Sequence, residues 1–168
     1  MAGVKADGTE LERLVGLVRV RRFDAAIEGL KQFLVQFPDN EVAAGLLGAT
    51  YFEIGLPQQA LEHYQRVMEL NPQNALARFQ IGMVHLSRGE HQAALEAWAP
   101  LTLDSREFMA HFHSALACME LGDTARAREM LEVAGANMPV GHPLFAQLKS
   151  LRARLAGEPP VSGRGYPQ

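Results

Sequence analysis

The residues best suited to chemistry are six histidines and one cysteine, and their spacing argues against a catalytic or metal site. His111 and His113 flank Phe112, and on a helix two residues in such positions point to different faces. They therefore lack the i, i+4 geometry of a metal-binding pair. The single cysteine, Cys118, excludes an internal disulfide and a cysteine-based zinc site. Its position within an apolar helical pattern predicts a buried, unreactive thiol.

The other histidines give no better catalytic set. His85 stands at a packing position of a helical pattern, so we expect it to be partly buried. His63 could meet Glu62 or Glu69 only across a helix surface. No Ser, His and Asp set can be assembled, and neither a Walker-type loop nor a dinucleotide fingerprint occurs. The sequence therefore predicts no enzyme, no cofactor and no bound metal.

The composition predicts a soluble, cytoplasmic protein with a real core. The chain has 168 residues, of which 48% are hydrophobic and 21% charged, enough for one domain or one short repeat array. Lys and Arg number 16 against 19 Asp and Glu, a net charge of -3, which argues against a nucleic-acid partner. No continuous apolar stretch of membrane-spanning length occurs, which argues against membrane insertion.

Positive charge is concentrated in two places. Arg19, Arg21 and Arg22 lie at the end of the first expected helix, where they complement the helix dipole or contact an acidic partner or phosphate. Residues 142–168 carry four basic side chains against one acidic one, a net of +3 that leaves -6 for the rest of the chain. This asymmetry could steer a partner without identifying it.

A repeat of 33 or 34 residues organises the chain. One alanine series, one glycine series and one series of bulky apolar residues keep the same register. A proline recurs in three of the four units, and the third unit has Arg106 at that place. The three series are Ala26, Ala60, Ala94 and Ala127; Gly55, Gly89 and Gly122; and Leu30, Tyr64, Trp98 and Leu131.

Each unit predicts two helices joined by a short turn. In the second unit, apolar residues at helical spacing predict helices over 41–55 and 57–70. Gly55 is suited to end the first helix in a left-handed conformation, and Pro57 is suited to the first turn of the second. The small alanines let the two helices approach closely, and the bulky residue four positions later fills the core.

These residues resemble the tetratricopeptide repeat family. The second unit carries the signature best, and the other units keep parts of it. The resemblance implies an all-α, right-handed superhelical array of about four helix pairs plus a C-terminal capping helix, with a non-catalytic, protein-binding role. The signature residues are Leu47, Gly48, Tyr51, Ala60, Tyr64 and Pro72 in the second unit, Ile81, Gly82, Ala94 and Trp98 in the third, and Ala127 and Pro139 in the fourth.

The repeat register divides the chain into segments. Residues 1–6 are expected to form a flexible N-terminus, followed by units at about 7–40, 41–74, 75–107 and 108–141. Within 142–156, Leu144, Leu148, Leu151 and Leu155 predict one apolar helix stripe, with Arg152 on the wet face, and so a cap for the array. Residues 157–168 are rich in Pro and Gly, which predicts a disordered tail or a docking motif around Tyr166.

The family resemblance also implies that the first helices of the units line a concave binding groove. The residues left over for that face are almost all apolar, whereas a site for a C-terminal carboxylate would need Lys, Arg and Asn. An apolar strip of this extent indicates a partner with an apolar or amphipathic segment. The expected groove residues are Leu11, Val15, Val18, Gly45, Ala49, Phe52, Phe79, Met83, Leu86, Phe112, Leu116 and Met119.

Two functions fit this expectation. A small array with an apolar groove resembles the tetratricopeptide chaperones of bacterial type III secretion, which implies an adaptor or chaperone for an apolar client, in a secretion or assembly system. The alternative is a self-assembling scaffold whose apolar face is covered by a second copy of the chain, a homo-oligomer. Because the same residues could also pack against neighbouring helices, groove and core remain open at this point.

Overall fold

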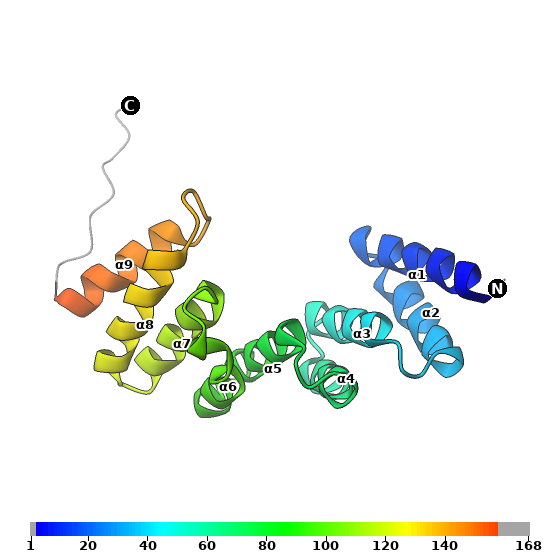
Figure 1. The fold of residues 1–168 in the computed structure, drawn as a ribbon, viewed down its shortest axis with the longest axis horizontal. Helices are drawn as coiled ribbons and strands as arrows, with labels where there is room; N and C mark the ends of the chain where they lie inside the picture. The colour runs from blue at the N-terminus through cyan, green and yellow to red at the C-terminus, as the bar shows by residue number, and fades with distance from the viewer. Residues whose placement is uncertain (1–2, 158–168) are drawn as a thin grey trace. The chain divides into compact units, whose positions relative to one another are not determined.

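The computed structural model describes residues 3–157, and all of the regular secondary structure in that range is helical (Figure 1). It contains nine α-helices and one short 3₁₀-helix, and it confirms the predicted all-α repeat fold. The helices are α1 (Gly3–Arg19), α2 (Phe23–Gln36), α3 (Glu41–Glu53), α4 (Pro57–Leu70), α5 (Ala75–Ser87), α6 (His91–Trp98), η1 (Leu101–Leu103), α7 (Phe108–Glu120), α8 (Thr124–Asn137) and α9 (Phe145–Ala156).

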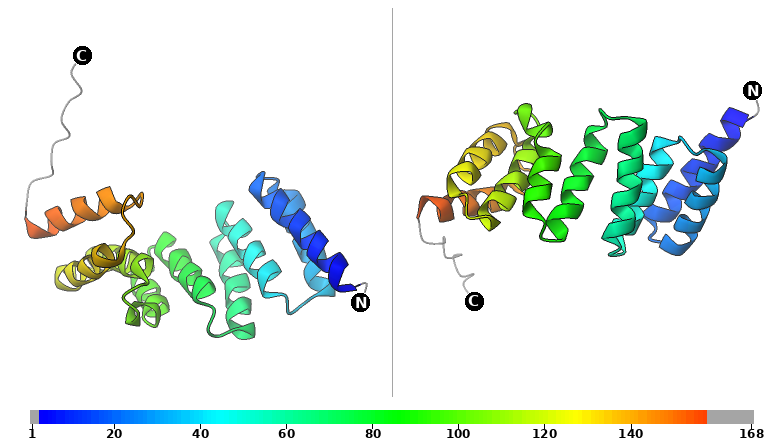
Figure 2. Two further views of the ribbon diagram at one scale, coloured as in Figure 1. Left: turned by 45° about the horizontal axis from the view of Figure 1, so that its top comes forward. Right: turned by 90° about the horizontal axis from the view of Figure 1, so that it is seen from below.

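The chain forms two compact units, residues 1–89 and 90–168, and the division falls between α5 and α6. Within the first unit, α1 packs on α2, α2 on α3, α3 on α4 and α4 on α5. Within the second unit, α6 packs on α7, α7 on α8 and α8 on α9. Successive helices within a unit lie side by side as antiparallel neighbours (Figure 2).

Local sequence signals set the helix ends. Asn40 and Asn74 cap α3 and α5, because each side-chain oxygen accepts a hydrogen bond 2.9 Å long from the backbone N–H three residues later. The predicted glycine stops are confirmed: the φ angles of Gly55, Gly89 and Gly122 are 76°, 72° and 78°, in the left-handed region. These stops turn the chain after α3, α5 and α7.

Close helix approach builds the core of the first unit. At Gly48 of α3, the place of a Cβ atom lies 3.1 Å from the ring of Tyr64 on α4 and 3.3 Å from the carbonyl oxygen of Ala60. Tyr64 and Ala60 are both buried, as the repeat series predicts. The surrounding cluster includes Leu14, Leu30, Leu47, Tyr51 and Val84.

The second unit has its own core. Trp98 is fully buried, and its ring centroid lies 5.9 Å from that of His113 on α7. A cluster from α7, α8 and α9 contains Phe112, Leu131, Leu148 and Leu151. The predicted apolar stripe of the cap is therefore confirmed, since Leu148 and Leu151 bury it against α8 and α7.

Three helix ends add to what the sequence predicts. Helix α1 begins at Gly3, whereas the sequence predicts the array to start at residue 7. Helix α6 ends at Trp98 and is followed by η1, because Pro100 cannot continue the helical hydrogen-bond ladder. Gly157 ends α9 with a φ angle of 80°, and the rest of the expected tail, including Tyr166, lies outside the described residues.

Candidate functional site

A groove opens in the first unit among its first helices, and we call it the first-helix groove. Helices α1, α3 and α5 line it, and α4 forms its floor. Its volume is about 350 Å³, within the size range of ligand pockets. Its lining residues are Val15, Glu41, Val42, Gly45, Leu46, Ala49, Tyr64, Val67, Asn74, Leu76, Ala77 and Gln80.

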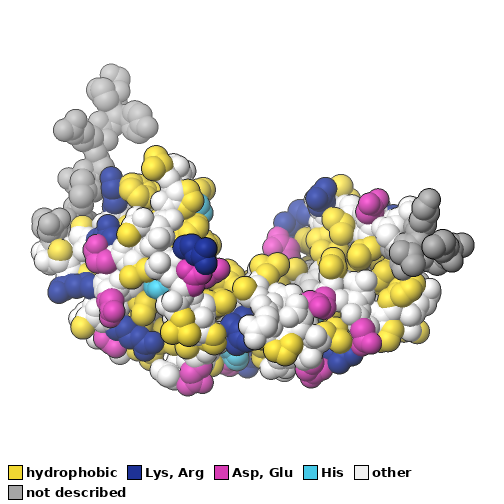
Figure 3. Space-filling model, viewed as in Figure 1, with side chains coloured by type: hydrophobic (Ala, Val, Ile, Leu, Met, Phe, Trp, Pro, Cys, Tyr) yellow, Lys and Arg dark blue, Asp and Glu magenta, His cyan; other side chains and the backbone are white. Residues whose placement is uncertain are grey.

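The groove presents apolar side chains to solvent. Val42 is 61% exposed and Leu76 is 69% exposed. Gly45 lies in the same lining without a side chain, and a Cβ there would reach ordinary contact distance, 3.8 Å, from the buried Val67 of the floor. In the space-filling view, hydrophobic side chains gather over the surface of α1 to α3 (Figure 3). Covering these side chains would be favourable by about 25 cal/mol for each Å² removed from water.

One end of the first-helix groove is polar and well ordered. The carboxylate oxygen Oε2 of Glu41 accepts hydrogen bonds from the side-chain amides of Asn71, at 3.0 Å, and Asn74, at 3.3 Å. These bonds tie the start of α3 to the linker before α5, so they fix the two walls relative to one another. Glu41 is the single charged residue of the lining. Burial raises the pKa of Tyr64 in the floor to about 12, which keeps its phenol neutral.

The structure places three of the expected groove residues in this lining: Val15, Gly45 and Ala49. The other expected residues of the first unit are half-buried outside it. Two of these, Leu11 and Phe52, pack against the core cluster around Leu47. The half-buried residues outside the lining are Leu11, Val18, Phe52, Phe79, Met83 and Leu86.

The expectation that Phe112 is an exposed groove anchor is wrong. Phe112 is 1% exposed and belongs to the core of the second unit, together with Leu131 and Leu148. Helices α8 and α9 supply the side chains that cover it. Leu116 and Met119 are half-buried against the same cluster. In the fourth repeat, the face assigned to a groove therefore serves as core.

Two exposed apolar residues of the groove, Val42 and Leu76, are not among those that the sequence predicts for it. Each is the second residue of a first helix, and they stand 34 positions apart in the repeat register. Met109 holds the corresponding place in α7. An apolar residue recurring at a helix start, where solvent exposure is common, was the available signal.

The histidines and the cysteine are packed rather than arranged for chemistry. Cys118 is buried as predicted, and burial raises the pKa of its thiol. Burial lowers the pKa of His113 to about 4. The His63 ring stacks on Tyr51 at 5.5 Å, and burial lowers its pKa as well. Within residues 3–157, no group of three His, Cys, Asp or Glu side chains is placed to hold a metal ion.

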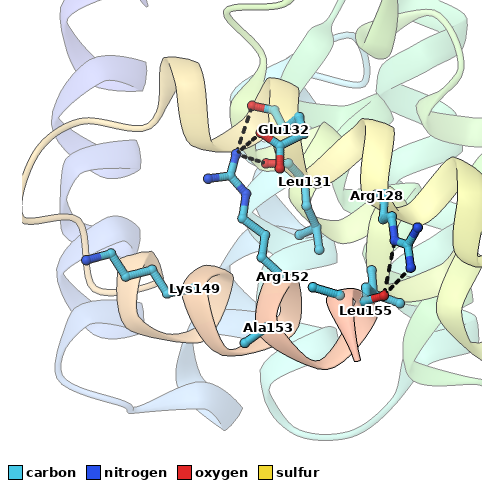
Figure 4. Close-up of a pocket in the computed structure, with 8 residues that line it drawn as sticks. Arg128, Leu131, Glu132, Lys149, Arg152, Ala153 and Leu155 are labelled. Carbon is cyan, nitrogen blue, oxygen red and sulfur yellow. Dashed lines mark hydrogen bonds and ion pairs between the residues drawn. The ribbon is translucent and has the colours of Figure 1, made fainter. Parts of the chain in front are cut away.

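A second pocket of about 400 Å³, which we call the C-terminal pocket, lies between α8 and α9 (Figure 4). Arg152, which the sequence predicts on the wet face of its helix, is half-buried: its guanidinium donates to the carbonyl of Leu131 at 3.1 Å and to the carboxylate of Glu132 at 2.8 Å. Arg128 of α8 donates in turn to the carbonyl of Leu155. The lining residues are Arg128, Leu131, Glu132, Lys149, Arg152, Ala153, Leu155 and Ala156.

Antiparallel helix pairs with a 33- or 34-residue period define a helical repeat protein. The sequence profile of the tetratricopeptide repeat family matches residues 15–75 and, in an overlapping register, 46–105. These matches take in more than half of the chain, so the chain belongs to the tetratricopeptide repeat family, as its signature residues predict. Members of this family are typically non-catalytic modules of protein–protein interaction. None of the helices described here is long and apolar enough to cross a membrane.

Two curated relatives share 32% identity with this chain. One is the TPR repeat-containing protein PA0015 of Pseudomonas aeruginosa, matched over 72 residues, 43% of this chain and 69% of that protein. The other is anaphase-promoting complex subunit 3 of Schizosaccharomyces pombe, matched over 87 residues. That match takes in 51% of this chain and spans 13% of the relative's length.

Solved structures share the fold over most of the chain. A crystal structure of MamA matches with a TM-score of 0.75 and 25% identity, over 84% of this chain and 81% of that one. The Pseudomonas aeruginosa PilF structure matches with a TM-score of 0.78 and 16% identity, over 94% of this chain and 70% of that one. The second likeness concerns the fold alone.

Proposed function

We propose that this chain is a non-catalytic adaptor or chaperone that holds an apolar or amphipathic segment of a partner protein in the first-helix groove. The observation that carries the proposal is the exposure of the apolar side chains of Val42 and Leu76 in the lining of one groove. Covering side chains of this kind with a partner lowers the free energy of the complex, and a groove with a fixed shape loses little conformational entropy on binding. Family membership supports a protein partner.

A guest segment with an apolar helical face fits this groove better than a highly charged peptide. Glu41 is the one ionised side chain of the lining, and its Oε2 already accepts two amide donors. Apart from Tyr64, Asn74 and Gln80, the remaining lining residues are apolar, and they match Leu or Val residues at positions i, i+3, i+4 and i+7 of an amphipathic helix.

The test compares two exposed leucines. A fluorescent peptide of about 16 residues, with leucines on one helical face and neutral polar residues elsewhere, serves as the probe. Leu76→Ser should weaken its binding about tenfold or more, because burying a leucine contributes about 1.5–3 kcal/mol. Leu103→Ser is the matched control, since Leu103 is 88% exposed but lies outside the groove. Equal effects of the two substitutions would contradict the proposal.

The alternative, a self-assembling scaffold, predicts a different result in the absence of any peptide. Light scattering over a dilution series would then show a dimer or larger species that dissociates on dilution. Leu76→Ser would shift that equilibrium toward the monomer. A wild-type chain that stays monomeric and binds the probe supports the adaptor or chaperone role.

A further inference from the structure

Helix α9 occupies the place of a first helix without a second helix beside it. It packs on α8 as α3 packs on α2 and as α5 packs on α4. The first helices α1, α3 and α7 each pack on the second helix that follows them. Within residues 3–157 no helix follows α9, so one of its long faces has no such partner there.

The residues on that face of α9 suit close contact with another helix. Lys149, Arg152, Ala153 and Ala156 follow one another at i, i+3, i+4 and i+7, so they form one stripe along α9. All four line the C-terminal pocket. The two alanines leave room for a close helix approach, as the alanine series does inside the array. Leu148 and Leu151 of the apolar stripe lie on another side of α9 and are already buried, whereas Leu155 of that stripe borders the pocket.

The charges of the pocket favour an acidic binding partner. Its lining carries three basic side chains and one acidic one, Glu132, which is already paired with Arg152 at 2.8 Å. Helix α9 contains no acidic residue, although the whole chain has a net charge of -3. The Lys149 ammonium lies 5.0 Å from the centroid of the Phe145 ring, and its side chain is exposed. A carboxylate brought beside Lys149 would gain an ion pair in a partly enclosed site.

We propose that the C-terminal pocket docks a short acidic, amphipathic helix of another protein, which completes a fifth helix pair with α9. Carboxylates of the guest pair with Lys149 and approach the outer edges of the Arg128 and Arg152 guanidiniums. Its apolar residues lie on Ala153 and Ala156. Residues 158–168 are a poor guest by sequence, because they contain one acidic side chain and three prolines.

The experiment uses the full chain and two labelled helical peptides of about 16 residues that differ only in Glu or Gln at the polar positions. The Glu peptide should bind more tightly than the Gln peptide. Lys149→Glu should weaken the Glu peptide about tenfold or more. Arg154→Glu makes the same change in net charge at an exposed cation of α9 that does not line the pocket, and it should change affinity by less than about twofold. Both variants should retain the wild-type circular dichroism spectrum and melting temperature.

Several results would overturn the proposal. Equal losses from Lys149→Glu and Arg154→Glu would show general charge attraction instead of a pocket. Equal binding of the Glu and Gln peptides would remove the role of charge. Tighter binding of a single-stranded oligonucleotide or of phosphatidylserine vesicles than of the Glu peptide would assign the basic face to another partner class. The neutral peptide bound by the first-helix groove should be unaffected by Lys149→Glu, which keeps the two sites distinguishable.

Discussion

Gly48 and Gly16 both lie in first helices, and their surroundings predict substitution effects of opposite sign. A Cβ at Gly48 would stand 3.1 Å from the buried Tyr64 ring and 3.3 Å from a backbone oxygen, whereas nothing lies within 4 Å of one at Gly16. Gly48→Ala should lower the free energy of unfolding by about 1–2 kcal/mol, because the crowding outweighs the helix-propensity gain. Gly16→Ala should raise it by up to about 1 kcal/mol. Urea unfolding of both variants measures the difference, and stabilisation by Gly48→Ala would contradict the close packing.

The buried His113 should make the stability of the second unit sensitive to acid. Burial lowers its pKa from the ordinary 6.5 to about 4, so between these pH values the unfolded chain takes up a proton that the folded chain does not. Its contribution to stability is complete above about pH 6.5 and is lost as the pH falls toward 4, by an amount on the order of 2–3 kcal/mol. His113→Phe should flatten the dependence of unfolding free energy on pH in this window. The unfolding free energies of both proteins are measured by urea titration at pH 7 and pH 4.5. An equal fall in free energy between these pH values for the variant and the wild type would refute this.

At the scale of elements, the sequence predicts the helices well because their signals are local. The helix over 57–70 begins at Pro57 and ends at Leu70 as predicted, and Gly55 makes the expected left-handed stop. What the sequence could not predict is which side of α7 its C-terminal neighbour would cover. Repeat register alone predicts that Phe112 lines the groove. The buried stripe of α9 packs in the same cluster as Phe112, so this residue belongs to the core.

The role of α9 in this core predicts a strong difference between two adjacent residues. Leu148→Ala should cost about 2–5 kcal/mol, because Leu148 is fully buried in the cluster with Phe112. Gln147→Ala, at an exposed position of the same helix, should change stability by less than about 0.5 kcal/mol. Thermal unfolding compares them. Similar melting temperatures for the two variants would show that α9 does not close the array.

At the scale of the whole molecule, the two compact units have separate core clusters. In a repeat protein, stability is approximately a sum of local terms, so damage to one unit need not spread through the chain. Leu148→Ala should therefore speed amide hydrogen exchange in α7, α8 and α9 while α2, α3 and α4 keep their protection. Exchange read by mass spectrometry decides this. Equal acceleration in both units would show one cooperative structure instead.

The sequence predicts what kind of site to expect, but only some of the residues that line it. Val15, Gly45 and Ala49, which the repeat register assigns to the inner face, lie in the lining of the first-helix groove, because first-helix positions recur with the repeat. The recurring apolar residue at a helix start points to Val42 and Leu76, but repeat register alone does not give their exposure, because that depends on how the neighbouring linkers fold. Hydrogen bonds from the Asn71 and Asn74 amides to Glu41 set that geometry, and repeat register carries no information about them.

The most direct measurement of partner binding is site-specific photocrosslinking in the native cell. Ala49 is an exposed residue of the first-helix groove, and Ala99 is an equally small exposed residue of the second unit outside both pockets. With a benzophenone side chain at position 49, we expect crosslinks to apolar residues of a different protein, and we expect position 99 to give none. Crosslinks from position 99 alone, or crosslinks from position 49 to a second copy of this chain, would contradict the first-helix groove as the site that holds an apolar partner segment.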